Sequence, residues 1–148
     1  MVTGITLPPV FSKDTTLLAN GTYLFRLSLT DNEGNLVSEN DYWNNAPGTK
    51  NFKVFNDLGQ VELKIDYKPS VSKQLLRVTN PSSVMAIAVK LNATNTKTRE
   101  IILPAYFSEG YFNLLPGETK HIMMDIPSPV MPEALSIAAS GYNIRSSM

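Results

Sequence analysis

Short runs in which apolar and polar residues alternate are the feature that most constrains the fold of this chain. Thr22–Thr30 and Gln60–Tyr67 both alternate strictly, which places successive side chains on opposite faces of an extended strand. Turn residues separate such runs roughly every 8–12 residues, and ten prolines interrupt the chain. No window shows helical periodicity. The chain is therefore predicted to be all-β.

The region from Asn51 to Asn143 supplies roughly seven or eight strands, enough for a complete immunoglobulin-like β-sandwich. The predicted strands are Phe52–Phe55, Gln60–Tyr67, Gln74–Thr79, Val84–Leu91, Ile101–Phe107, Tyr111–Leu115, Thr119–Ile126 and Ala134–Ser140. Val84–Leu91 is apolar on both faces, as expected of a central strand. A polar loop is expected at Asn92–Glu100, and the Leu-Pro-Gly-Glu sequence at residues 115–118 is expected to turn a hairpin.

An extra N-terminal β-hairpin is predicted before the sandwich. Thr22–Thr30 runs into Asp31–Asn35, where Gly34 can take positive φ, and Leu36–Tyr42 returns as the partner strand. A lone hairpin is marginal in water. We therefore expect this one to dock on the main sandwich or on a neighbouring molecule.

A polar stretch with a Pro-Gly pair, Asn44–Asn51, is the predicted domain boundary. Residues 1–47 are expected to form the C-terminal hairpin of a preceding sandwich domain, and residues 48–148 the immunoglobulin-like domain. Ile5 and Leu7 could start a strand that Pro8-Pro9 stops. Together with Met1, this opening suggests a fragment of a longer protein.

Charge and cysteine content exclude several classes of function. Thirteen basic and 13 acidic residues give zero net charge, which offers no electrostatic support for nucleic acid or an anionic membrane as partner. The absence of cysteine excludes disulfides, thiolate metal sites and cysteine nucleophiles. No apolar run approaches the roughly 20 residues of a membrane-spanning helix. No cofactor is expected, and the sequence leaves the compartment open.

Three titratable residues could be catalytic candidates, but the sequence places no suitable partner group beside any of them. His121 is the only histidine and lies on an alternating strand, where a histidine is usually a surface residue. Glu109 and Glu118 could suggest a glycosidase carboxylate pair. Glu118, however, follows Pro-Gly in a tight turn, where such a residue usually accepts a local hydrogen bond. The chain is not expected to be an enzyme on its own.

Aromatic residues mark two candidate contact sites. Tyr106, Phe107, Tyr111 and Phe112 bracket the loop Ser108–Gly110, and about half of them should face the core because strand side chains alternate. Those left outside could stack on a sugar ring. Tyr42 and Trp43 end a strand beside the predicted boundary, where packing at an interdomain joint is favoured over ligand stacking. The candidate contact residues are Tyr42, Trp43, Ser108, Glu109 and Tyr111.

Several motifs in order resemble the C-terminal part of large family 2 glycoside hydrolases, of the exo-β-glucosaminidase and β-mannosidase type. The hairpin from Tyr23 to Trp43, with its Asp-x-x-Gly turn, is similar to the hairpin that closes the penultimate domain in that family. The motifs similar to the terminal domain are Asn80-Pro81-Ser82, Leu103-Pro104, Tyr106-Phe107-Ser108, Tyr111-Phe112, Leu114-Leu115-Pro116-Gly117-Glu118 and Gly141-Tyr142-Asn143. Two positions depart from the family: Ser108-Glu109-Gly110-Tyr111 replaces an Asp-Asn-Tyr-like sequence, and Tyr142 replaces a tryptophan.

The resemblance implies a non-catalytic accessory domain. The family's catalytic glutamates lie in an upstream (β/α)₈ barrel, which needs about 250 residues and cannot fit here. The expected partners are other domains of the same polypeptide and an oligosaccharide, which would bind in a substrate cleft that this domain helps to form. The implied parent is a periplasmic or secreted hydrolase of β-glucosaminide or β-mannoside sugars. The alternative is a carbohydrate-binding module or a cell-surface adhesion sandwich.

Overall fold

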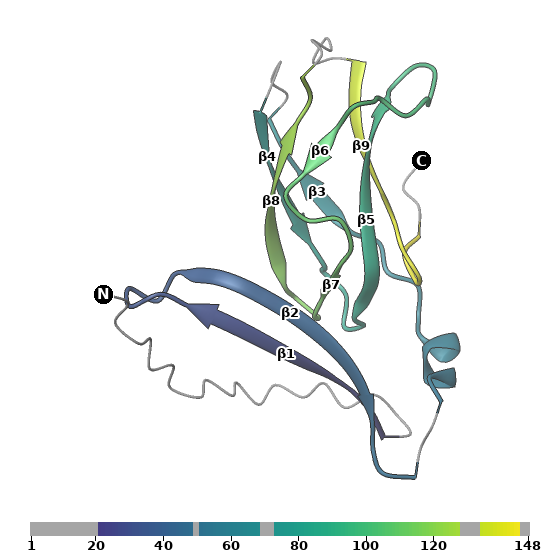
Figure 1. The fold of residues 1–148 in the computed structure, drawn as a ribbon. Helices are drawn as coiled ribbons and strands as arrows, with labels where there is room; N and C mark the ends of the chain where they lie inside the picture. The colour runs from purple at the N-terminus through teal and green to yellow at the C-terminus, as the bar shows by residue number, and fades with distance from the viewer. Residues whose placement is uncertain (1–20, 49–50, 69–72, 128–133, 146–148) are drawn as a thin grey trace. The chain divides into compact units, whose positions relative to one another are not determined.

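The computed structural model describes residues 21–48, 51–68, 73–127 and 134–145. The predicted opening strand at Ile5–Leu7 and its stop at Pro8-Pro9 lie outside the described residues. The chain divides into two compact units, Met1–Asp57 and Leu58–Met148, which are described separately below (Figure 1). The assignment of residues 1–47 to a preceding domain stays a prediction.

The first unit contains the predicted hairpin. Strands β1 (Thr22–Thr30) and β2 (Leu36–Asn45) pair antiparallel. Gly34 takes a φ of 86° in the connecting loop, which confirms the predicted turn. On one face, the Arg26 guanidinium binds Asp41 in a bidentate pair, Nε–Oδ1 2.8 Å and Nη2–Oδ2 3.0 Å. This geometry fixes the register between the strands.

The other face of the hairpin is apolar and exposed. Phe25 lies opposite Tyr42, and Leu27 and Leu29 follow on the same face of β1. All four side chains are exposed. Where this face docks stays a prediction.

A 3₁₀ helix, Lys53–Asp57, replaces the predicted strand Phe52–Phe55, so that prediction was wrong. The helical turn lets the rings of Phe52 and Phe55, three residues apart, stack with centroids 5.5 Å apart. Asn51 Oδ1 accepts a hydrogen bond from the Lys53 N–H, as an N-cap does. Two aromatic residues at this spacing favour the turn over an extended run.

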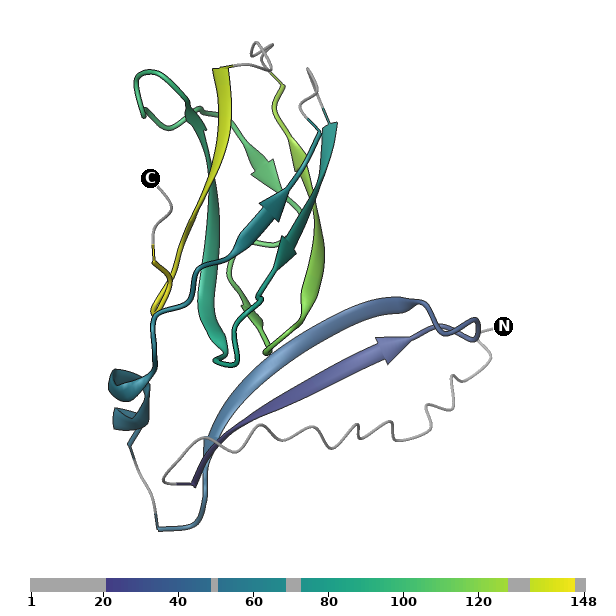
Figure 2. The same cartoon turned by 180° about the vertical axis from the view of Figure 1, so that it is seen from behind.

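The second unit is a β-sandwich, which confirms the predicted fold class (Figures 1 and 2). One layer is a four-stranded sheet in the order β3-β4-β8-β6, and the other a three-stranded sheet in the order β7-β5-β9. The strands are β3 (Lys64–Asp66), β4 (Lys73–Thr79), β5 (Ala86–Asn95), β6 (Tyr106–Phe107), β7 (Phe112–Leu114), β8 (Thr119–Asp125) and β9 (Leu135–Ser140). Every pairing within these sheets is antiparallel.

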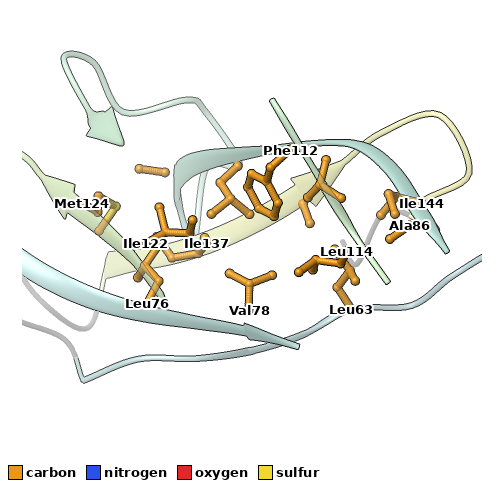
Figure 3. Close-up of a cluster of buried hydrophobic side chains, with 14 of the residues drawn as sticks. Leu63, Leu76, Val78, Ala86, Phe112, Leu114, Ile122, Met124, Ile137 and Ile144 are labelled. Carbon is orange, nitrogen blue, oxygen red and sulfur yellow. The ribbon is translucent and has the colours of Figure 1, made fainter. Parts of the chain in front are cut away.

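The core fills the space between the two layers (Figure 3). The alternation that predicted the strands also predicts which side chains lie there: Leu76 and Val78 of β4 are fully buried, and so is Ile122 of β8. Burying each such aliphatic side chain contributes about 1.5–3 kcal/mol. The labelled members of the cluster are Leu63, Leu76, Val78, Ala86, Phe112, Leu114, Ile122, Met124, Ile137 and Ile144.

Three predicted strand boundaries were wrong. Of Gln60–Tyr67 only Lys64–Asp66 is strand, and Val61 forms an isolated bridge to Ile144. β5 continues to Asn95, so the loop predicted at Asn92–Glu100 starts later. Ala93 is buried on the core face, which keeps the segment paired with β9 despite its polar neighbours. In Ile101–Phe107 only Tyr106–Phe107 is strand, and Ile101 forms an isolated bridge to Thr94.

The Leu-Pro-Gly-Glu turn connects the two layers and does not form the predicted hairpin. β7 before it pairs with β5, while β8 after it pairs with β4 and β6. The buried Asn80 holds this crossover, because its Nδ2 donates to Leu114 O (3.1 Å) and Leu115 O (3.2 Å). Glu118 accepts the Leu115 N–H at 2.7 Å, which confirms its predicted role as a local acceptor.

Candidate functional site

The loop Ser108–Gly110 was the first candidate contact site. The Ser108 N–H donates to Met123 O (2.8 Å), and Ser108 Oγ accepts the Met123 N–H (3.0 Å). Both bonds extend the pairing of β6 with β8 by one residue. The serine hydroxyl therefore acts as a hydrogen-bond acceptor at the edge of the sheet.

Glu109 forms an ion pair with Lys120. The lysine Nζ lies 3.3 Å from Oε1 and 3.2 Å from Oε2 of the carboxylate. The lysine side chain is largely covered and the glutamate is partly exposed. Since a partly exposed pair is worth at most about 1 kcal/mol, its main effect is to fix the loop beside β8. A carboxylate engaged on both oxygens by an ammonium is poorly suited to general acid catalysis.

The aromatic residues beside this loop divide as the alternation predicts. Phe112 is 6% exposed and joins the core, and Phe107 packs against it from β6. Tyr106 and Tyr111 are 60% and 72% exposed. The two tyrosines are thus available for an external contact.

Tyr42 and Trp43 face opposite sides of β2. Tyr42 belongs to the exposed apolar face of the hairpin. Trp43 makes an edge-on contact with Phe55 of the 3₁₀ helix, with centroids 4.8 Å apart and planes at 68°. Trp43 thus packs beside the end of the first unit, and an interdomain or sugar contact for either residue stays a prediction.

The described residues assemble no catalytic or metal-binding cluster. His121 is exposed on β8 and its strand neighbour is the cation Arg77, so no carboxylate orients the imidazole across that pair. No three His, Cys, Asp or Glu side chains gather closely enough within the described ranges to hold a metal ion. In the same part of the chain, no helix is long and apolar enough to cross a membrane.

A hollow of about 640 Å³ opens near the end of β3 and the start of β4. Its lining includes Tyr67, whose hydroxyl donates to Leu135 O at 3.2 Å. Burial raises the pKa of the Tyr67 phenol above its ordinary value, because the phenolate would lose hydration. None of the predicted site residues lines this hollow, whose full lining is Asp66, Tyr67, Lys68, Lys73, Gln74 and Leu75.

Asn143 is the residue whose importance the sequence did not reveal. It is 2% exposed, and its Oδ1 accepts the Ile87 N–H at 3.0 Å. Its Nδ2 donates to Met85 O (2.8 Å) and Gly59 O (3.1 Å). The side chain therefore joins three segments that are distant in sequence. The only signal for it was its place in the closing Gly-Tyr-Asn motif, because an asparagine after a strand ordinarily predicts a solvated turn.

Comparison with solved structures shows where this fold recurs. The chain is similar to the exo-chitosanase CsxA of Amycolatopsis orientalis, with a TM-score of 0.68 and 21% identity over 86% of this chain and 18% of that one. A complex of a variant of that enzyme with PNP-β-D-glucosamine gives a TM-score of 0.65 at 21% identity, over the same shares of both chains. The chain thus spans less than a fifth of the length of these structures. No curated protein matches it.

The family comparison gives a more specific result. The chain matches the model of the exo-β-D-glucosaminidase Ig-fold domain over residues 40–144. The match begins within β2. Because the match covers most of the chain, the protein belongs to the family of exo-β-D-glucosaminidase Ig-fold domains.

Proposed function

We propose that this chain is the accessory domain of a multidomain family 2 glycoside hydrolase that cleaves β-D-glucosaminide linkages. The observation that carries the proposal is the family match over residues 40–144. The domain packs against other domains of the same polypeptide and helps to shape one side of the substrate cleft. Catalysis belongs, in this proposal, to a barrel elsewhere in that polypeptide, since such a barrel needs about 250 residues.

Residues 1–47 belong, in this proposal, to the preceding domain of the same hydrolase. The exposed apolar face formed by Phe25, Leu27, Leu29 and Tyr42 supports this reading, because two strands alone cannot cover such a face. In the parent protein, further strands of the preceding domain cover it.

The test compares the full-length polypeptide with the present chain on nitrophenyl glycosides. Full-length protein should hydrolyse the β-D-glucosaminide much faster than the β-D-mannoside, and the present chain should hydrolyse neither. Hydrolysis by the purified chain, or a full-length protein inactive on both sugars, would contradict the proposal.

A carbohydrate-binding module is the second candidate. The strong exposure of Tyr106 and Tyr111 favours it, because exposed tyrosine rings can stack on sugar rings. Isothermal titration of the chain with chito-oligosaccharides separates the two functions. Saturable binding that is lost in a Tyr106→Ala, Tyr111→Ala double variant supports a binding module, whereas an accessory domain gives no heat of binding.

A further inference from the structure

The outer face of the four-stranded sheet carries a row of exposed apolar side chains on three adjacent strands. Leu75 of β4 lies directly opposite Met123 of β8, and Tyr106 of β6 lies opposite Asp125, two residues further along β8 on the same face. The exposed fractions are 55% for Leu75 and 44% for Met123, with Tyr106 more exposed still. Neighbouring strands are about 4.8 Å apart, so these side chains form a continuous strip, here called the apolar row.

Charged residues border the apolar row on both sides. At one end Lys73 lies 4.0 Å from Asp125. At the other end Arg77 lies opposite Asp66 in the strand pairing, and the Asp66 carboxylate forms an ion pair with Lys64 at 3.3 Å. Among the described residues, no carboxylate forms an ion pair with Arg77. These three cations and two carboxylates of the border sum to a net charge of +1.

The outer face of the other sheet has a different character. Its outward strand residues are small or polar: Lys90, Asn92 and Thr94 of β5, and Ser136, Ala138 and Ser140 of β9. Ile101, in its bridge to Thr94, places a single exposed apolar side chain at the edge of this face. The β3-β4-β8-β6 face, where exposed apolar side chains of three adjacent strands adjoin, has the composition of a buried contact. Tyrosine, methionine and arginine are the residues enriched at the centres of protein interfaces.

We propose that the apolar row is the surface by which the sandwich docks on another domain of its parent hydrolase, and that the docked surface carries a carboxylate that pairs with Arg77. This inference rests on the proposed function and names the contact face. Aliphatic Leu75 and Met123 fit an apolar protein surface better than a sugar, which binds to flat aromatic platforms. A second copy of the chain fits poorly, because a symmetric contact would bring the same excess of positive charge against itself.

Methionine oxidation by hydrogen peroxide, followed by mass spectrometry, tests the proposal in the unmodified protein. Met123 is exposed, and its neighbour Met124 is fully buried and serves as the control within the same peptide. Docking should slow the oxidation of Met123 in the full-length polypeptide by roughly tenfold or more relative to the present chain, since access governs this reaction. Equal rates in the two proteins overturn the proposal.

Two further outcomes would assign the surface to another occupant and also overturn it. If Met123 is already protected in the present chain, and sedimentation shows a dimer, the occupant is a second copy. If chito-oligosaccharides protect Met123 in the present chain, the occupant is a sugar.

A charge reversal tests the role of Arg77. In the full-length protein Arg77→Glu should restore the oxidation of Met123 toward the rate in the present chain, whereas Arg77→Lys should retain most of the protection. Lys90→Glu, an equal reversal on the opposite sheet, is the matched control and should leave protection unchanged. Unchanged protection in Arg77→Glu removes the carboxylate from the proposal.

The failure of this inference and the failure of the proposed function are distinguishable. Glucosaminidase activity in a full-length protein whose Met123 oxidises freely contradicts the docking surface alone. Protection of Met123 in a full-length protein without that activity contradicts the proposed function alone.

Discussion

Replacing Asn143 by alanine should destabilise the sandwich strongly, because three backbone groups lose their partner. The bonds to Ile87 N and Met85 O are buried, and the bond to Gly59 O is partly buried. A buried backbone group left unsatisfied costs about 1–3 kcal/mol, whereas the partly exposed Gly59 carbonyl can form a hydrogen bond with water instead. We therefore expect Asn143→Ala to lower the free energy of unfolding by about 3 kcal/mol.

Urea unfolding followed by circular dichroism measures this loss, which should appear in the midpoint and not in the slope. Each kcal/mol of lost stability lowers the Tm of a domain of this size by about 4–8 °C. Asn143→Asp should cost at least as much, since it keeps the acceptor for the Ile87 N–H but turns a carboxylate toward two carbonyl oxygens. Asn92→Ala on the outer face of β5 is the control, with an expected change within about 0.5 kcal/mol.

The reasoning is refuted if Asn143→Ala loses less than about 1 kcal/mol, the net value of a single ordinary hydrogen bond. Such a result would mean that water reaches the Ile87 and Met85 backbone groups in the variant, and that Asn143 does not hold the three segments together.

Three more changes have expected outcomes. Gly141→Ala should cost about 1–3 kcal/mol in urea unfolding, because its Cβ would lie 2.6–3.1 Å from three atoms, while Gly59→Ala meets only one atom at 3.6 Å and should be near neutral. Because the pKa of Tyr67 is raised in the folded state, its contribution to stability is fully present below the pKa of the unfolded state, 10.0, and is lost as the pH rises through the pKa of the folded state. Tyr67→Phe should therefore lose less stability at alkaline pH, which is measured as the free energy of unfolding against pH. The side-chain hydrogen bond from Asn35 lowers the pKa of Asp31 below 3.8. The hairpin loop is therefore stabilised above about pH 3.8 and loses this stabilisation as the pH falls through the pKa of the folded state. NMR chemical shifts of the loop should follow this acid transition, and Asp31→Ala should abolish it.

The alternation of side chains predicted much of this fold, because burial on one face of a strand is a local property of sequence. Leu76 and Val78 point inward where the period of two places them, and the exposure of Tyr106 against the burial of Phe112 follows the same rule. The family resemblance read from the ordered motifs was also confirmed.

The errors arose where contacts distant in sequence decide the local structure. Asn92 and Thr94 are polar, yet pairing with β9 extends the strand through them. The Leu-Pro-Gly-Glu turn has the chemistry of a hairpin, but the chain crosses between layers there because Asn80 binds the carbonyls on its near side. Sequence patterns indicate a turn and do not indicate which sheet the next strand will join.

The three hydrogen bonds of the Asn143 side chain also affect the kinetics of folding. Its contact with Gly59 spans 84 residues of chain, and the parallel bridge between Val61 and Ile144 closes beside it. Ordering so long a loop is entropically costly until the intervening strands are in place, so this closure should form after the transition state for folding. Weakening the hydrogen bonds of Asn143 would then shorten the lifetime of the native domain by accelerating unfolding, and would leave the rate of folding nearly unchanged.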